Sequence, residues 1–369
     1  MLRSLYSSQA GLGVNSTKLD VISNNIVNAS TTAFKSSRAR FEDTLYQNSR
    51  SASSPIDTLG GMNAAQVGLG VKVAGIDLMM KQGSMQPTNR NTDFAIDGEG
   101  FFMVTKGSSI YTDADGKSDM NVSNTTFNAT YSGQKNNNVL YTRDGAFIID
   151  DYGNLTTSDG YKVLGYAVTG VCSDGSTATK SSIVKDDTNK KGGYKVNFVD
   201  ANNKDKPVQV VESTDDTTSS LVTLVIPSEI NDNGTMRKVV SFSVDADGTV
   251  KANCGEKTAV IGQIAMAKFS NATGLEKTGS NMYKQSSNSG VAEVRVGLNA
   301  KVKSGGDEVA ATSNAAAYGD ILQNNLEMSN VDLAAEFSDM IVATRAFQAC
   351  GKMITTDDEI LQEIINLKR

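Results

Sequence analysis

The stretch LAAEFSDMIVATRAFQACGKMITTDDEILQEII runs from Leu333 to Ile365 and decides how this chain is built. Its apolar residues recur every three or four positions, which is the spacing of an amphipathic helix. The stripe consists of Leu333, Phe337, Met340, Thr344, Phe347, Gly351, Ile354, Asp358, Leu361 and Ile365. A helix of this length exceeds the average globular helix, and its apolar stripe must be buried against a partner.

The other end of the chain carries the same kind of pattern. A helix is predicted from about Leu2 to Asn28, with Gly11 and Gly13 as weak points. Its stripe consists of Leu2, Leu5, Gln9, Leu12, Ser16, Leu19, Ser23 and Ile26. The asparagines at the end of this segment favour caps and turns, because their side chains compete for backbone hydrogen bonds.

The C-terminal helix has a second apolar stripe on an adjacent face, formed by Ile341, Met353, Ile360, Ile364 and Leu367. Its first stripe contains Thr344, Gly351 and Asp358, and Cys350 lies beside them. Polar and small residues therefore interrupt the apolar stripe, which is not a purely apolar contact surface for a single partner helix. An intramolecular helical hairpin and packing between molecules both remain open. Because a helix that is apolar on two faces needs more than one neighbour, the pattern favours packing between molecules.

The middle of the chain is rich in Gly, Asn, Ser and Thr and is typical of strands and turns. The predicted fold class is therefore α+β, with terminal helices packed together as a coiled-coil-like layer, a mainly β core domain and a second, inserted β domain. The expected parts are a helical domain (1–33 and 325–369), a connecting arm (34–66), the core (67–167 and 238–324) and the insertion (168–237).

Several local patterns predict particular elements. Hairpins are expected around Asp97-Gly98, Asp144-Gly145 and Asp247-Gly248, because Asp-Gly favours tight turns between strands. The segment 34–46 could be a short helix or an extended arm. Helix is expected again from Tyr318 to the C-terminus.

Composition limits the function. The 369 residues carry a net charge of −6 and a pI near 5.0, which argues against nucleic acid as a partner. No apolar run is long enough to span a membrane, and the N-terminus lacks the pattern of a cleaved signal peptide. The chain has no histidine, so it lacks the commonest general acid/base and a common metal ligand. We expect no enzyme and no cofactor.

Candidate metal and phosphate sites are weak. Asp113-Ala-Asp115-Gly116 and Asp245-Ala-Asp247-Gly248 resemble the start of a calcium loop, but hairpin turns explain both, and we expect no metal. The glycines at Gly68, Gly70, Gly98 and Gly100 complete no nucleotide fingerprint. The remaining reactive residues, Cys172, Cys254 and Cys350, have no metal-ligand or redox spacing.

Several motifs carry a resemblance. They are LDVISNNIVN at 19–28 with STTAFK at 30–35, VGLGVKVAGI at 67–76, DFAIDGEGFF at 93–102 with YTRDGAF at 141–147, and NVDLAAEF at 330–337 with Met340, Arg345, Phe347 and Leu361. Together with 262–290, these motifs resemble the bacterial flagellar axial proteins, the rod and hook family, over more than half of the chain. The family usually has Gly at the position of Ala33 and Ala at that of Val27, which puts a left-handed turn before Phe34 in doubt.

The resemblance implies a structural subunit of the flagellar hook, a curved hollow tube that acts as a universal joint between rod and filament. The alternative within the family is a distal rod subunit, a straight drive shaft. Outside it, a soluble carbohydrate-active or adhesive β protein with internally packed helices remains possible.

The resemblance also implies partners and places. The chain would polymerise with itself, contact rod, hook-cap and hook–filament junction proteins, and leave the cell through the flagellar export apparatus without a cleaved signal. Its terminal helices would line a channel, and its arm would bridge subunits. The expected assembly residues are Leu2, Leu5, Leu12, Leu19, Ile26, Phe34, Leu333, Phe337, Met340, Phe347, Ile354, Leu361 and Ile365.

Overall fold

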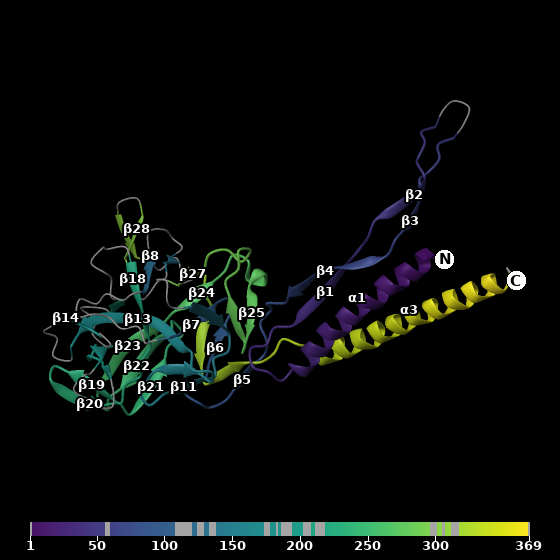
Figure 1. Cartoon of the computed structure of the whole chain (residues 1–369). Coiled ribbons are helices and arrows are strands. Elements are labelled where there is room, and N and C mark those ends of the chain that lie inside the picture. Colours follow the sequence, from purple (N-terminus) through teal and green to yellow (C-terminus); the bar gives the residue numbers. More distant parts are fainter. Residues whose placement is uncertain are drawn as a thin grey trace. The chain divides into compact units, whose positions relative to one another are not determined.

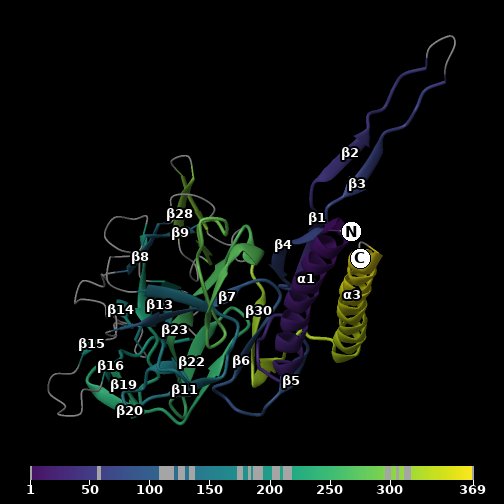
Figure 2. The same ribbon diagram turned by 45° about the vertical axis from the view of Figure 1, so that its right-hand side comes forward.

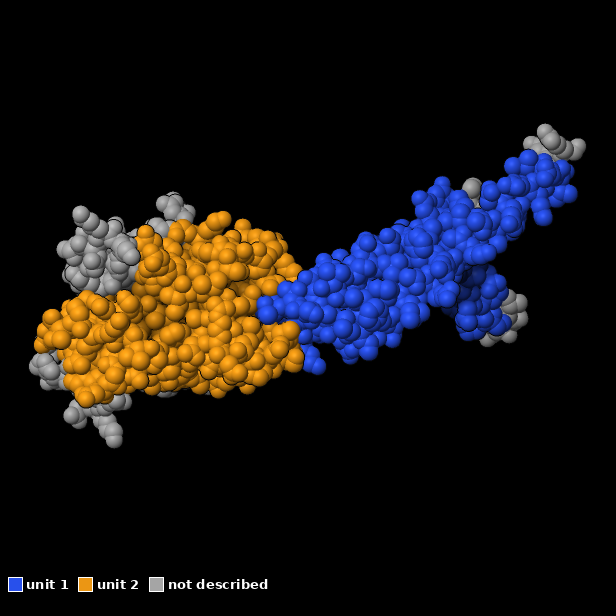
Figure 3. All heavy atoms as spheres, turned by 90° about the horizontal axis from the view of Figure 1, so that it is seen from below, with its two compact units in different colours: residues 1–81, 329–369 blue, residues 82–328 orange. Residues whose placement is uncertain are grey.

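The computed structural model describes residues 2–55, 60–107, 120–123, 129–132, 138–172, 178–181, 184–185, 194–201, 208–210, 218–295, 301–304, 307–310 and 317–367. The chain divides into two compact units, coloured in Figure 3. Unit 1 combines Met1–Lys81 with Ser329–Arg369, and unit 2 is Gln82–Met328. The two ends of the chain therefore belong to one unit, and the strand-rich middle forms the other.

Unit 1 contains the helices α1 (Leu2–Val27) and α3 (Leu333–Leu367), which lie side by side and antiparallel (Figures 1 and 2). The expected packing of the terminal helices is thereby confirmed. The prediction that helix starts at Tyr318 is wrong, since Asp320–Gln323 and Asn325–Glu327 are strands. The helix starts later because the Asp332 carboxylate caps it, accepting hydrogen bonds from the backbone N–H of Ala334 (2.9 Å) and Ala335 (3.3 Å).

The segment after α1 is an extended two-stranded arm. Strand β1 (Ser37–Asp43) pairs with β4 (Val71–Leu78), and β2 (Tyr46–Arg50) pairs with β3 (Ala65–Gly68). Of the two conformations open for residues 34–46, the extended one is found. The arm also includes residues 67–78, which were expected in the core domain.

The strands of unit 2 include β5 (Met85–Pro87), β6 (Phe94–Asp97), β7 (Phe101–Lys106), β8 (Met120–Ser123), β9 (Ala129–Ser132), β10 (Asn138–Thr142), β11 (Phe147–Ile149), β12 (Leu155–Thr157), β13 (Lys162–Val171), β14 (Ala178–Lys180), β15 (Val184–Lys185), β16 (Tyr194–Lys195), β17 (Gln209–Val210), β18 (Thr218–Thr223), β19 (Glu229–Asp232) and β20 (Thr235–Lys238). They continue as β21 (Ser241–Val244), β22 (Thr249–Asn253), β23 (Thr258–Ile264), β24 (Met266–Lys268), the short helix η1 (Ala272–Gly274), β25 (Glu276–Gly279), β26 (Met282–Lys284), β27 (Glu293–Val294), β28 (Lys301–Ser304), β29 (Asp307–Ala310), β30 (Asp320–Gln323) and β31 (Asn325–Glu327).

The core of unit 2 is aromatic and aliphatic. Phe94, Phe102 and Phe147 are almost fully buried, and the rings of Phe102 and Phe147 meet edge to face with centroids 5.4 Å apart. These phenylalanines come from the β-core motifs of the sequence. The phenylalanines of the motifs at 93–102 and 141–147 therefore lie in the packed core of the unit.

Two of the three expected hairpins are wrong. Strand β6 pairs with β30 rather than with β7, and β10 pairs with β7 rather than with β11. The chain diverges at Gly98, whose φ of 121° suits glycine, and a Cβ there would lie 2.9 Å from Gly319 Cα. The third expected hairpin, β21–β22 around Asp247-Gly248, is present.

No separate inserted domain is set apart among the described residues of 168–237. Strand β18 pairs with β13, which belongs to the expected core domain, and Val196 and Phe198 are part of the main apolar core. Val168, Val199 and Val208 form a second, small apolar cluster with Val260, and β19 pairs only with β20 among the described strands. The described residues of 168–237 thus share part of their packing with the expected core, and a separate inserted domain stays a prediction.

Of the two calcium-like segments, the structure describes only Asp245–Gly248. Asp113–Gly116 lies outside the described residues. In the second, Asp245 pairs with Lys251, and Asp247 lies 3.1 Å from the Arg295 guanidinium, so both carboxylates already face cations in a hairpin turn. In the described part of the chain, neither terminal helix is long and apolar enough to cross a membrane.

Candidate assembly surface on the terminal helices

Small and polar side chains take part in the packing of α1 and α3. Ser8 is 4% exposed, and a Cβ added at Gly11 would lie 3.0 Å from the Cys350 sulfur. Ala343 faces inward as well and is the one buried residue of α3 in the described structure. Val14 and Ile22 of α1 are buried as well, at 8% and 4% exposure, so unit 1 also removes apolar surface from water.

One asparagine joins three elements of unit 1. Asn25 is 2% exposed, and its side-chain amide donates to the Ser37 carbonyl (2.8 Å) and to the Glu336 carboxylate (2.9 Å). Its amide oxygen accepts a hydrogen bond from the Ser37 backbone N–H (3.0 Å). Asn25 lies in the last turn of α1, within the predicted helix, and its side chain joins the base of the arm to the start of α3.

A second polar cluster also fixes the base of the arm. The Asn330 amide donates to the carbonyls of Met79 (2.8 Å) and Lys81 (3.0 Å), and its oxygen accepts from the Ser36 N–H (2.8 Å). The ammonium of Lys35, which is fully buried, also donates to the Lys81 carbonyl (2.9 Å). These bonds hold together the three backbone segments that meet at the base of the arm.

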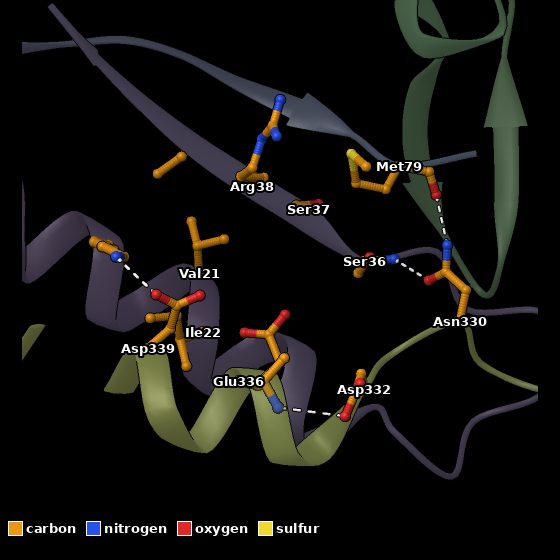
Figure 4. Close-up of a pocket in the computed structure, with 13 residues that line it drawn as sticks. Val21, Ile22, Ser36, Ser37, Arg38, Met79, Asn330, Asp332, Glu336 and Asp339 are labelled. Atoms are coloured by element: carbon orange, nitrogen blue, oxygen red, sulfur yellow. Dashed lines mark hydrogen bonds and ion pairs between the residues drawn. The ribbon is translucent and has the colours of Figure 1, made fainter. Parts of the chain in front are cut away.

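A cavity of about 250 Å³ lies between α1, β1 and α3 (Figure 4). The apolar side chains of Val21 and Ile22 line it, together with an ion pair between Lys18 and Asp339 at 3.2 Å. Burial raises the pKa of the Glu336 carboxyl, and the hydrogen bond from Asn25 opposes that shift. The charged groups of the described cavity lining all have partners: Lys18 pairs with Asp339, Arg38 with Asp77, Glu336 with Asn25, and Asp332 with backbone N–H groups.

The main feature of α3 is the apolar surface that unit 1 leaves uncovered. Its side chains with at least 40% of their area exposed include Leu333, Phe337, Ile341, Val342, Phe347, Met353, Ile360, Ile364, Ile365 and Leu367. Exposed apolar side chains in this number on one helix are typical of a surface that binds a partner. This surface is the candidate functional site of the chain.

The structure brings together some of the predicted assembly residues. Leu5, Leu12, Leu19 and Ile26 on α1 are half-buried, as are Met340, Ile354 and Leu361 on α3 and Phe34 before the arm. Leu333, Phe337, Phe347 and Ile365 are exposed. Leu2 lies in α1, but its side chain is outside the described structure. Whether these residues contact other subunits stays a prediction.

Sequence reasoning missed the residues that join α1 to α3. Gly11, Asn25 and Glu336 are small or polar, so no apolar period marks them. A signal did exist for Gly11, because a glycine inside a helix often has a packing reason. The asparagines at 24–28 gave a second signal, which indicated caps and turns at the end of the predicted helix rather than contacts with α3.

Three family models match the chain. They describe a flagella basal body rod protein (residues 5–35), a flagellar hook protein FlgE/F/G D1 domain (131–252) and the C-terminal part of flagellar basal body rod FlgEFG proteins (322–367). The first and third cover most of the two terminal helices, and the second covers part of unit 2.

Whole-length relatives agree with these matches. The chain is 35% identical to the flagellar basal-body rod protein FlgG of Bacillus subtilis, with 100% of both chains covered. It is 28% identical to the flagellar hook protein FlgE of Borreliella burgdorferi, again over 100% of both chains, and 26% identical to that of Escherichia coli over 97% of this chain and 98% of the relative. The solved Helicobacter pylori hook protein FlgE2 aligns with 66% of this chain and 100% of its own at 10% identity, with a TM-score of 0.32 that is too low to define a fold.

Proposed function

Because this chain belongs to the family of flagellar hook and basal-body rod proteins, whose members are structural proteins and not enzymes, we propose that it polymerises through its terminal helices into the axial structure of the flagellum. The proposal rests chiefly on one observation. The 35-residue helix α3 keeps most of its large apolar side chains exposed while it packs against α1. Neighbouring copies of the chain would cover those side chains, and the burial of apolar surface would drive assembly.

In this proposal the helices form a coiled-coil-like layer that lines the channel of a hollow polymer, and the arm bridges adjacent copies. The arm has the surface for this role. Leu45 is 79% exposed and Tyr46 is 55% exposed, on a hairpin too thin to bury them itself. Rod, hook-cap, junction and export-apparatus proteins are the expected partners, and export without a cleaved signal is the expected route.

The hook was the position predicted within the axis, and the rod is its alternative. One comparison favours the rod. The alignment with the Bacillus subtilis rod protein spans 370 positions, whereas those with the hook proteins span 456 and 457 positions. Those hook proteins therefore contain long segments that this chain of 369 residues lacks. The 35% identity points the same way.

Electron microscopy of basal bodies from cells that lack this chain separates the two positions. A hook subunit predicts complete rods without hooks, and a rod subunit predicts truncated rods. Complementation with a chain that lacks residues 333–369 is the control, and we expect it to restore neither structure. Normal hooks and rods in the deletion strain would contradict the proposed function.

A further inference from the structure

One hairpin of unit 2 closes on an asparagine that is followed by a glycine. Strands β19 and β20 pair as far as Asp232 opposite Thr235 (Figure 1). Asn233 and Gly234 lie between them and form a two-residue turn. Their φ angles of 51° and 93° are those of a type I′ turn, in which both central residues are left-handed. No other asparagine in the sequence is followed by a glycine.

This Asn-Gly pair is open to covalent chemistry. Both residues are exposed, and a Cβ placed on Gly234 would meet nothing within 4 Å. The amide carbon of an asparagine side chain is attacked by the backbone nitrogen of the next residue, which is one reason that asparagine is thermolabile. Glycine hinders that attack least, because no side chain shields its nitrogen. The sequence therefore concentrates this reactivity at one turn.

We propose that Asn233 deamidates spontaneously and that the side chain of Asn231 slows the reaction. A bond forms between the Gly234 nitrogen and Asn233 Cγ, and the bond from Cγ to Nδ2 breaks. Ammonia leaves and takes with it the proton of the Gly234 N–H. The resulting succinimide then takes up one water, and opening at the backbone carbonyl gives isoaspartate, whereas opening at Cγ gives aspartate. Water is the only co-reactant, and the inference does not depend on the proposed function.

The folded turn opposes the reaction in two ways. The Gly234 N–H donates a hydrogen bond to the Asn231 side-chain oxygen at 2.9 Å, which holds the proton that must be removed. In a type I′ turn the first central residue has a ψ of about +30°, and this ψ turns the Asn233 side chain away from the following nitrogen. Attack therefore requires the turn to open, and the hydrogen bond to Asn231 adds to the cost of opening.

The modification changes the turn and leaves its anchors in place. Ile230 is fully buried in the main apolar core, and the Arg237 guanidinium lies 2.7 Å from the buried Asp232 carboxylate. Isoaspartate lengthens the backbone by one bond and adds a negative charge, so the turn loses its two-residue geometry. We expect the end of the β19–β20 hairpin to loosen while the rest of unit 2 stays folded.

The test follows the full chain over several weeks in mildly alkaline buffer. Peptide mass spectrometry detects deamidation as the mass gained when a carboxyl group replaces an amide, which isomerisation at the Asp-Gly pairs does not produce. We expect the peptide that contains Asn233 to be modified first. Asn89 is the matched internal control, because it is exposed and has a φ of 57° but precedes Arg90. Its peptide should stay unmodified.

Two variants test the role of Asn231. Asn231→Ala removes the acceptor, and we expect deamidation at Asn233 to become about fivefold faster, which corresponds to one hydrogen bond of about 1 kcal/mol. Asn231→Asp keeps an oxygen acceptor at the same place and should react no faster than the parent. Both variants keep the backbone bonds of residue 231 to Val196 and Phe198, and circular dichroism checks that they are folded.

Three results would overturn the inference. Deamidation at Asn89 as fast as at Asn233 would show that the Asn-Gly turn is no special site. An unmodified Asn233 in buffer, in a chain that deamidates there once urea has unfolded it, would show that the fold blocks the reaction altogether. An Asn231→Ala variant that reacts at the parent rate would show that Asn231 does not slow the attack.

Discussion

Glu336 lies where α1, β1 and α3 meet, and its carboxylate accepts a hydrogen bond from Asn25 beside Lys18, Asp339 and Asp332. Burial raises the pKa of this carboxyl above its ordinary value of 4.5. A raised folded-state pKa stabilises the fold below the unfolded pKa, and this contribution is lost as the pH rises through the folded value. The junction of the two helices should therefore be tightest under mildly acidic conditions.

Glu336→Gln keeps the acceptor for Asn25 and removes the charge. We expect this variant to be slightly more stable than the parent at pH 7.5 and to lose that advantage at pH 4. Thermal unfolding followed by circular dichroism at the two pH values measures the difference. Glu359→Gln, at an exposed position of the same helix, controls for the general loss of a negative charge. A parent that gains on the variant as the pH rises would contradict the assignment.

Arg143 and Glu327 form an ion pair in unit 2 at 3.3 Å, with side chains that are 6% and 0% exposed. Arg143→Ala leaves the Glu327 carboxylate buried without its guanidinium, so we expect a loss of about 3–5 kcal/mol in the free energy of unfolding. Urea unfolding followed by tyrosine fluorescence measures it, since the chain has no tryptophan. The double variant Arg143→Met/Glu327→Met should lose less, because it buries no unpaired charge. Equal losses in the two variants would show that packing, not charge, dominates.

Ala33 corrects an expectation at the residue scale. An alanine in place of the family's usual glycine put a left-handed turn before Phe34 in doubt. The turn is present, because Ala33 has a φ of 53° and is 1% exposed. An alanine in this conformation costs about 1–2 kcal/mol. The polar cluster of Lys35 and Asn330 immediately after it supplies hydrogen bonds that hold the backbone in place.

At the scale of elements, the register of α1 against α3 depends on small residues. Gly11→Cys would place its Cβ 3.0 Å from the Cys350 sulfur. In a disulfide, where the S–S bond is about 2.04 Å long, the Cβ of one cysteine lies about 3 Å from the sulfur of the other. We expect a disulfide between Cys350 and the new cysteine to form on mild oxidation, and peptide mass spectrometry under non-reducing conditions detects it. It also locks the antiparallel register of the pair.

Gly13→Cys is the matched control for this crosslink. A Cβ at Gly13 meets nothing within 4 Å, so the same oxidation should leave Cys350 free. A bond to Cys350 from position 13, or none from position 11, would mean that the helices pack in another register.

At the scale of the whole molecule, unit 2 has what it needs to fold alone. Its two ends are adjacent, because β5 pairs with β31 and the Gly83 N–H donates to the Glu327 carboxylate at 2.9 Å. Its core includes the buried Phe94, Phe102 and Phe147. A contiguous unit with close ends and its own core can fold independently.

We therefore expect the fragment 82–328 to fold cooperatively and to remain monomeric at concentrations at which the full chain polymerises. Analytical ultracentrifugation and circular dichroism measure both properties. A fragment that pellets with the full-length polymers, or polymerises by itself, would place assembly contacts in unit 2 rather than in the helices. An unfolded fragment would show that unit 2 depends on unit 1.

The sequence by itself determined the terminal helices, the extended strands between them and membership of the axial family, because each depends on local periodicity or on contiguous motifs. It did not determine which residues join α1 to α3. Apolar spacing marks the side chains that need burial, whereas Gly11, Asn25 and Cys350 meet their partners only through contacts distant in the sequence. The partners of β6, β7, β10 and β11 were missed for the same reason. An Asp-Gly pair shows that the chain turns, but the tertiary structure decides which strand receives each backbone hydrogen bond.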